Sequence, residues 1–355
     1  MNNLEQGNDS GTEEVPYHVI KHSLDNISLT SSEIGLLWRT YLCESMAICM
    51  LSYFVEKSKD PDIRSVLQFA LEGSNQHVKS IAAIFNVENI PIPHGFTGED
   101  FDVTAKKLFS EIFMLTYTRF EAKYSMVHFS LAFSNSVRPD ICGFFEGCLN
   151  NSLVLIKKAN EVLLAKGLLE RTPYMPIPDR VEYVHDVQNF FKGFIGKKRP
   201  INALEIEQCF VTAQSKLIER TLILGLGQVV KSKLLKDYLL RGKQIADKQI
   251  EVLGSFLTDE DLAIPATSDN QVTESTESPF SDKLIMFNIT AFSSLNMTGL
   301  GIAFANCARK DILLSISRLI AEVADYAKGG LDLMIKQGWL ERVPEASTRK
   351  ALRRQ

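Results

Sequence analysis

The chain has 355 residues, of which 45% are hydrophobic and 23% are charged, with a formal net charge of −4 and a pI near 6.0. This length and composition indicate a globular protein with about two domains. The chain lacks a broad excess of positive charge, which argues against nucleic acid as a partner, because such binding depends on neutralising phosphates.

The chain begins with a polar, acidic segment. Residues 1–28 lack a basic start followed by an apolar stretch, so we expect a flexible tail, no secretory signal and a cytoplasmic location. Six cysteines are spread over the chain without a Cys-x-x-Cys pair. They indicate small buried thiols in a reducing compartment.

Capping signals and apolar periodicity predict four helices in the first half. Thr30-Ser31-Ser32-Glu33 is a capping box, and the following apolar residues recur every three or four positions, which predicts a helix near 31–57. Asp60-Pro61 is typical of a helix start and places the second helix. We expect the third helix at about 106–136 and the fourth from Pro139 to Gly167.

The second half repeats the first. Residues 109–173 align without a gap onto 280–344 at a constant offset of 171, and both segments end in a Gly-Leu/Trp-Leu-Glu-Arg sequence. Asn202-x-x-Glu205 predicts the first helix of the second copy, and Ser278-Pro279 predicts the start of its third helix. The chain is therefore two copies of one four-helix domain.

Each copy has a long connection between its second and third helices, Val87–Ala105 and Thr258–Pro279. About 20 extended residues can span a whole helix of this length, whereas the other junctions are short. The sequence therefore predicts an all-α fold of two tandem ferritin-like four-helix bundles, each with a long crossover between helices two and three. The expected divisions are a tail at 1–28, bundle 1 at 29–172, an inter-domain segment at 173–200, bundle 2 at 201–345 and a tail at 346–355.

The inter-domain segment contains four aromatic residues among polar ones. We expect these side chains to wedge between the two bundles rather than to form a further domain. They are Tyr183, Phe190, Phe191 and Phe194.

Three motifs carry a family resemblance. The Ile92-Pro93-His94-Gly95-Phe96 turn, the Ser278-Pro279-Phe280-Ser281-Asp282-Lys283 helix start and the Gly338-Trp339-Leu340-Glu341 end resemble an uncharacterised family of duplicated ferritin-like proteins. That family occurs in spore-forming Firmicutes and is distantly similar to spore-coat F-type proteins. The resemblance covers nearly everything after residue 28 and implies spore association, but it implies no reaction. A histidine often stands in that family where this chain has Asn288.

The chain does not carry the ligands of a di-iron enzyme. Such sites need a glutamate from each of two helices and a Glu-x-x-His from each of the other two. The one Glu-x-x-His, Glu182 to His185, lies in the inter-domain segment. The sequence therefore argues against a di-iron oxygenase or ferroxidase, and we expect no cofactor of that kind.

A smaller site can be drawn in bundle 1. Glu44 interrupts the apolar stripe of helix one, His77 lies on the stripe of helix two, and Glu121 and His128 share one face of helix three. Carboxylates and imidazoles that converge in a bundle could hold a single divalent metal. The alternative is a hydrogen-bonded Glu–His pair that only fixes helix register.

Bundle 2 lacks these groups. When Gly73 is matched to Gly242, the counterparts of the four residues are Lys216, Ala246, Phe292 and Gly299. Every histidine of the chain lies at or before His185, so any imidazole site belongs to bundle 1. Leu284–Ala308 is uncharged and long enough for a membrane span, but its charged counterpart in the first copy favours a buried helix over a membrane partner.

Three functions remain open. The first is a non-catalytic structural or binding protein, which could be a homo-oligomer and which the resemblance links to sporulation. The second is a metal-binding protein or metal-dependent oxidoreductase that uses the site in bundle 1. The third is a carrier of an apolar small molecule held between helices.

Overall fold

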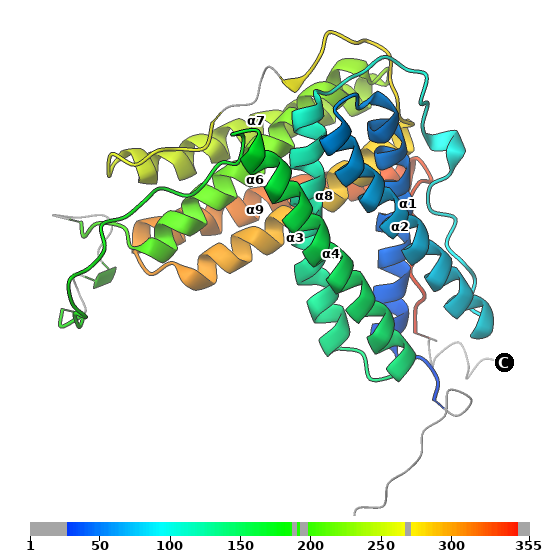
Figure 1. The fold of residues 1–355 in the computed structure, drawn as a ribbon, viewed down its shortest axis with the longest axis horizontal. Helices are drawn as coiled ribbons and strands as arrows, with labels where there is room; N and C mark the ends of the chain where they lie inside the picture. The colour runs from blue at the N-terminus through cyan, green and yellow to red at the C-terminus, as the bar shows by residue number, and fades with distance from the viewer. Residues whose placement is uncertain (1–26, 187–189, 192–197, 267–270, 347–355) are drawn as a thin grey trace, which may run out of the picture.

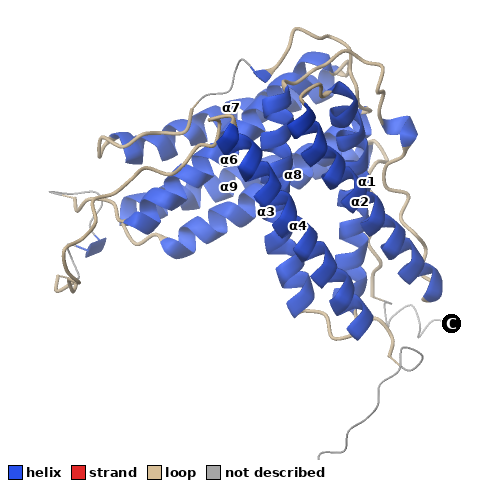
Figure 2. Cartoon of the chain, viewed as in Figure 1, coloured by secondary structure: helices blue, strands red, loops and turns tan. Residues whose placement is uncertain are grey.

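The computed structural model describes residues 27–186, 190–191, 198–266 and 271–346, which form two four-helix bundles (Figure 1). Bundle 1 consists of α1 (Ser31–Lys57), α2 (Pro61–Val87), α3 (Glu111–Ser134) and α4 (Pro139–Ala165). Bundle 2 consists of α6 (Ala203–Val229), α7 (Lys233–Thr258), α8 (Asp282–Asn306) and α9 (Lys310–Lys336). The prediction of a duplicated all-α bundle is confirmed, and no strand is present in this part of the chain (Figure 2).

The first helix of each bundle begins where its capping box predicts. Thr30 and Glu33 satisfy each other's backbone N–H groups before α1, and Asn202 and Glu205 do the same before α6. The third helices start later than expected, because Ser110 caps α3 and Ser281 caps α8. The prediction of a start near 106 for α3, and of one at Ser278-Pro279 for α8, is therefore wrong by a few residues.

The residues before these helices remain extended because the two long crossovers pair with each other. The backbone N–H of Asp102 donates to Pro279 O at 2.9 Å, and that of Thr273 donates to Leu108 O at 2.9 Å. Thr273 lies 171 residues after Asp102, and Leu108 lies 171 residues before Pro279. The repeat therefore relates the two bonds to each other. The crossovers are thus related by an approximate twofold axis between the bundles.

The ends of the fourth helices continue this symmetry. Glu341, after α9, accepts hydrogen bonds from the backbone N–H groups of His94 at 2.9 Å and Gly95 at 2.7 Å in the crossover of bundle 1. Glu170, after α4, accepts one from Ala266 at 2.9 Å in the crossover of bundle 2. Each bundle therefore holds the crossover of the other through the Gly-Leu/Trp-Leu-Glu end that the sequence repeats.

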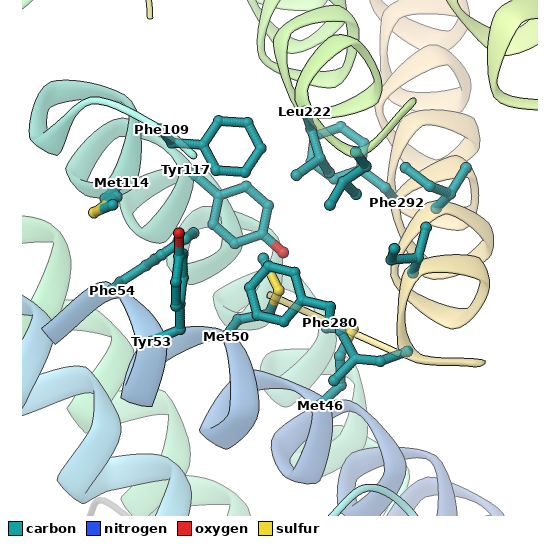
Figure 3. Packing of buried hydrophobic residues seen from close by; sticks show 14 of the residues in the cluster. Met46, Met50, Tyr53, Phe54, Phe109, Met114, Tyr117, Leu222, Phe280 and Phe292 are labelled. Atoms are coloured by element: carbon teal, nitrogen blue, oxygen red, sulfur yellow. The ribbon is translucent and has the colours of Figure 1, made fainter. Parts of the chain in front are cut away.

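One apolar core joins the two bundles. It includes Tyr53 and Phe54 of α1, Tyr117 of α3, Leu222 of α6 and Phe292 of α8, and Figure 3 shows these side chains converging from both halves. Each fully buried side chain of this size contributes roughly 1.5–3 kcal/mol, so this shared core stabilises the contact between the two bundles. One smaller apolar cluster fills the remainder of bundle 1, and another fills the remainder of bundle 2.

Of the described helices, α1 alone has the length and composition to cross a membrane. Its side chains Leu37, Tyr53 and Phe54 are fully buried in the protein, as expected for a core helix. The apolar composition of α1 is therefore accounted for by its packing in the core of bundle 1.

The inter-domain segment differs from its prediction. Tyr183 is 80% exposed and does not wedge between the bundles. Phe190 instead packs against the guanidinium group of Arg199, 4.8 Å from its ring centre, and Phe191 is exposed. Phe194 lies outside the described residues, as do most of the two predicted tails.

Candidate functional site

The four residues predicted to form a site all line one cavity in bundle 1. Its volume is about 130 Å³. Glu44 reaches it from α1, His77 from α2, and Glu121 and His128 from α3. Helix periodicity places each of them on an inward face, which is why the sequence could find them.

Glu44, His77 and Asn151 form a chain across the bundle. His77 Nδ1 lies 3.0 Å from Glu44 Oε1, and Asn151 Nδ2 lies 3.2 Å from His77 Nε2. Both ring nitrogens of His77 thus have a hydrogen-bond partner, Nδ1 in Glu44 and Nε2 in Asn151. The rings of Phe129 and Phe144 meet the imidazole edge-on and hold its plane. The sequence gave no reason to single out Asn151, which α4 contributes.

Glu121 and His128 are both neutral near pH 7. Burial, together with the charge of Glu44 and against the hydrogen bond from Tyr117, raises the pKa of Glu121 to about 8. Burial, with a smaller contribution from Arg39, lowers the pKa of His128 to about 4. Among the described residues, no group forms a hydrogen bond with His128 Nε2, although this atom is buried. This nitrogen is therefore a buried polar atom whose hydrogen-bonding capacity is unused.

The structure does not bring the predicted metal ligands close enough together to hold one ion. Across the described parts of the chain, no three His, Cys, Asp or Glu side chains lie near enough to hold one ion. The facing atoms of Glu44 and His77 are already bonded to each other. Metal binding stays a prediction, and elemental analysis of the purified protein with and without His77→Ala tests it.

Most of the remaining wall is apolar. Met50, Phe69, Phe129 and Leu155 come from bundle 1, whereas Ala291 and Leu295 come from α8 of bundle 2. The cavity thus lies where bundle 1 meets bundle 2. The sequence could not indicate this, because the contribution of α8 depends on how the bundles dock.

The twofold relation explains why bundle 1 has the cavity. At the related place in bundle 2, the ring of Phe120, which α3 of bundle 1 contributes, stacks on Phe292 of α8, with 4.5 Å between ring centres and 10° between planes. The residues related to this pair by the offset of 171 are Ala291 and Glu121, which both line the cavity. The rings of Phe120 and Phe292 fill the site in bundle 2. The smaller side chains of Ala291 and Glu121 leave the related site in bundle 1 partly open.

Tyr124 of α3 occupies the space beside the position in bundle 2 that corresponds to His128. Gly299 is the counterpart of His128, and a β-carbon on Gly299 would lie 2.5 Å from the hydroxyl oxygen of Tyr124. The Tyr124 hydroxyl also lies 3.5 Å from Ser215 Oγ of α6. A side chain at 299 would therefore displace the Tyr124 hydroxyl of the opposite bundle, so the space that His128 has in bundle 1 is taken up here by Tyr124.

The structure corrects one counterpart. α7 begins 172 residues after α2, and the buried pairs Ile81/Leu253 and Phe85/Leu257 keep this offset. His77 therefore corresponds to Gln249, not to Ala246. Matching Gly73 to Gly242 placed the alignment of α2 and α7 in the wrong register. A single glycine match arises by chance more easily than a match of all the buried positions of a helix.

Bundle 2 has polar groups of its own at this level. Gln249 Nε2 lies 3.4 Å from Glu322 Oε2, which repeats the His77 to Asn151 contact at related positions. Lys216, the counterpart of Glu44, is fully buried and pairs with Glu219 at 3.0 Å. The two bundles thus keep one polar layer but with different charges.

Asn288 lies on the approximate twofold axis. The Tyr117 hydroxyl oxygen is 3.2 Å from Oδ1 and 3.0 Å from Nδ2 of Asn288, and the two residue numbers differ by 171. Burial raises the pKa of Tyr117 well above its usual value, so it stays a neutral phenol. At the position where the resembled family often has histidine, this chain uses an amide that ties the two bundles together.

Comparisons with known proteins agree with the duplication. The chain matches the family described as "Protein of unknown function (DUF3231)" twice, over residues 20–181 and again over residues 189–352. No curated protein matches it. A candidate spore coat protein from Bacillus halodurans C-125 is similar in structure, with a TM-score of 0.39 and 14% sequence identity over 42% of this chain and 98% of that one. This last similarity is too low to carry an argument.

The family match covers nearly the whole length of the chain in two successive copies, and the structure shows the same two units as bundles. The chain therefore belongs to the DUF3231 family, as the duplicated motifs of its sequence indicated.

Proposed function

We propose that this protein binds a small, mostly apolar molecule in the cavity of bundle 1 and that its role is non-catalytic. The cavity supports this, because it combines an apolar wall with a few convergent polar groups.

Two titratable groups of the wall, unlike Glu121 with its pKa of about 8, are poorly suited to catalysis at neutral pH. Burial raises the pKa of Cys43 to about 11, so its thiol is a poor nucleophile at neutral pH. The pKa of about 4 for His128 makes its imidazole a weak base. Neither group is tuned toward the working pH, as a catalytic group would be.

The cavity volume limits the ligand. An apolar cavity of about 150 Å³ accepts benzene, so the space of about 130 Å³ here fits six or seven non-hydrogen atoms. Larger molecules would require the helices to move apart.

Calorimetric titration with cyclohexanol tests the proposal. The wild type is expected to bind one molecule per chain, and Ala291→Phe is expected to abolish binding, because its ring would fill the cavity as Phe120 fills the related site. Ser294→Phe adds the same ring to an exposed position of α8 and is expected to bind like the wild type. Binding that survives in Ala291→Phe, or no binding by the wild type, would contradict the proposal.

The resemblance also implies a spore-associated role, which stays a prediction. Detection of the protein in purified spores and in vegetative cells tests it.

A further inference from the structure

One side of the cavity is lined by residues that solvent also reaches. These residues form a row on each of α1, α3 and α8, at helical spacings of three or four positions, and all are half-buried except Arg39, which is exposed. Because the three rows line one cavity, they mark a slot between α1 and α3 that α8 borders. The rows are Arg39, Cys43 and Ala47 on α1, Glu121, Ser125 and His128 on α3, and Ala291 and Leu295 on α8.

The related slot of bundle 2 lies between α6 and α8, and Tyr124 of α3 closes it. The hydroxyl oxygen of Tyr124 lies 3.5 Å from Ser215 Oγ of α6, and it would lie 2.5 Å from a β-carbon on Gly299 of α8. The side chain of Tyr124 is 5% exposed. Its ring therefore covers the gap between these two helices.

Bundle 1 has a shorter side chain at the related place. The offset is 171 for Tyr124 and Gly299, and it is 172 between α1 and α6, which contains Ser215. Leucine lacks the ring and the hydroxyl group that close the slot of bundle 2, and all three counterparts are half-buried. The slot of bundle 1 is therefore less covered than its counterpart. The counterparts of Tyr124, Ser215 and Gly299 are Leu295, Cys43 and His128.

Arg39 lies at the same end of the slot. Burial raises the pKa of Cys43, and the charge of Arg39 opposes this; burial lowers the pKa of His128, and Arg39 adds to this. The guanidinium group is thus close to one side chain of α1 and to one of α3, which border the slot from its two sides. Exposed side chains change rotamer within nanoseconds or less, so Arg39 can leave the slot when a ligand passes.

The opposite side of the cavity, between α2 and α4, is bridged by side chains. A β-carbon on Gly73 would lie 4.0 Å from Asn151 Nδ2, and the same nitrogen lies 3.2 Å from His77 Nε2. One turn before Gly73, the ring of Phe69 lies beneath Lys158 of α4, with 5.4 Å from Nζ to the ring centre. The slot beside α8 is therefore the freer route.

From this geometry we propose that ligands enter and leave the cavity of bundle 1 through the slot between α1 and α3, and that Leu295 and Arg39 control this passage. The inference rests on the proposed binding function and adds the route and the residues that limit it. A side chain that narrows the route slows entry and exit alike, because both cross the same barrier.

Transfer of the tyrosine of bundle 2 into bundle 1 tests the route. Leu295→Tyr combined with His128→Gly reproduces the arrangement of Tyr124 beside Gly299. His128→Gly alone is the reference, because it makes the same space without the ring. Relaxation-dispersion NMR measures the exchange of fluorobenzene, a probe of the size that the cavity admits, with the full-length protein. Relative to the reference, the association and dissociation rate constants are both expected to fall about tenfold in the double variant.

Ser294→Tyr in the His128→Gly background is the matched control, since it adds the same ring to an exposed position of α8. It is expected to exchange as the reference does. A tyrosine that only took up cavity volume would speed dissociation. If dissociation from the double variant is as fast as from the reference, or faster, the proposed route is overturned and the binding function stands.

Arg39→Ala tests the other residue without a change in the core, because Arg39 is exposed. Both rate constants are expected to rise about threefold over those of the wild type. Exchange that is no faster would overturn the control assigned to Arg39, and this result is available even if the double variant does not fold. If fluorobenzene does not bind the wild type at all, the binding function fails together with the route.

Discussion

Replacing Phe120 with alanine is expected to give bundle 2 the cavity that bundle 1 already has. The side chain of Phe120 is 4% exposed and stacks on Phe292 between the bundles. At the related place in bundle 1, Ala291 leaves the space open. The substitution therefore makes residue 120 match its counterpart Ala291, whereas Phe292 still differs from its counterpart Glu121.

The cost follows from burial and packing. Loss of the buried ring forfeits roughly 2 kcal/mol of transfer free energy. A cavity that relaxes little adds roughly 2 kcal/mol for about 90 Å³ at about 24 cal/mol per Å³. We therefore expect Phe120→Ala to lower the free energy of unfolding by about 4 kcal/mol.

Urea denaturation measures this change, with Phe133→Ala as the matched control. Phe133 lies on the same helix and is 42% exposed, so its removal is expected to cost about 1 kcal/mol or less. Titration with cyclohexanol is the second assay, and it is expected to rise from one bound molecule per chain to two. The reasoning is refuted if Phe120→Ala costs no more than the control, or if a single molecule still binds.

Two carboxyl groups give opposite pH dependences. Burial alone would raise the pKa of Glu205, but hydrogen bonds from Arg199 and from backbone N–H groups lower it to about 2 from 4.5. Its stabilisation is present above pH 4.5 and is lost as the pH falls toward 2, so Glu205→Gln is expected to cost roughly 3 kcal/mol at neutral pH and little near pH 2 in urea denaturation. Burial raises the pKa of Glu121 above its unfolded value, so the neutral acid favours folding below pH 4.5 and this is lost as the pH rises toward 8. Glu121→Gln is expected to stabilise the protein by roughly 4 kcal/mol at pH 8 and by little at pH 4.5, and a difference independent of pH would contradict the assignment.

Local signals in the sequence were sufficient for the architecture. Capping residues such as Thr30 and Asn202 act on the helix that follows them, and the apolar stripes act within one helix, so each can be recognised without the rest of the fold. The repeat then shows that both halves adopt one form. The inward positions of Glu44, His77, Glu121 and His128 follow from the same periodicity, and all four line one cavity.

Contacts between the bundles could not be predicted in this way. Ala291 gives no signal of its own, and its effect on the cavity depends on the docking of α8 against bundle 1. The pairing of the crossovers, which delays the start of α3 to Glu111, depends on the same docking. Gln249 was missed as the counterpart of His77 because a single glycine match outweighed the periodicity of the buried face.

A crystal of the wild-type protein exposed to xenon under pressure tests most directly whether the bundles differ as described, because dry apolar cavities take up this gas. We expect one anomalous peak, in bundle 1 between Phe69 and Ala291, and none beside the stacked rings of Phe120 and Phe292. A peak at the Phe120 site, or an empty bundle 1, would show that the duplicated halves are not distinguished by this cavity.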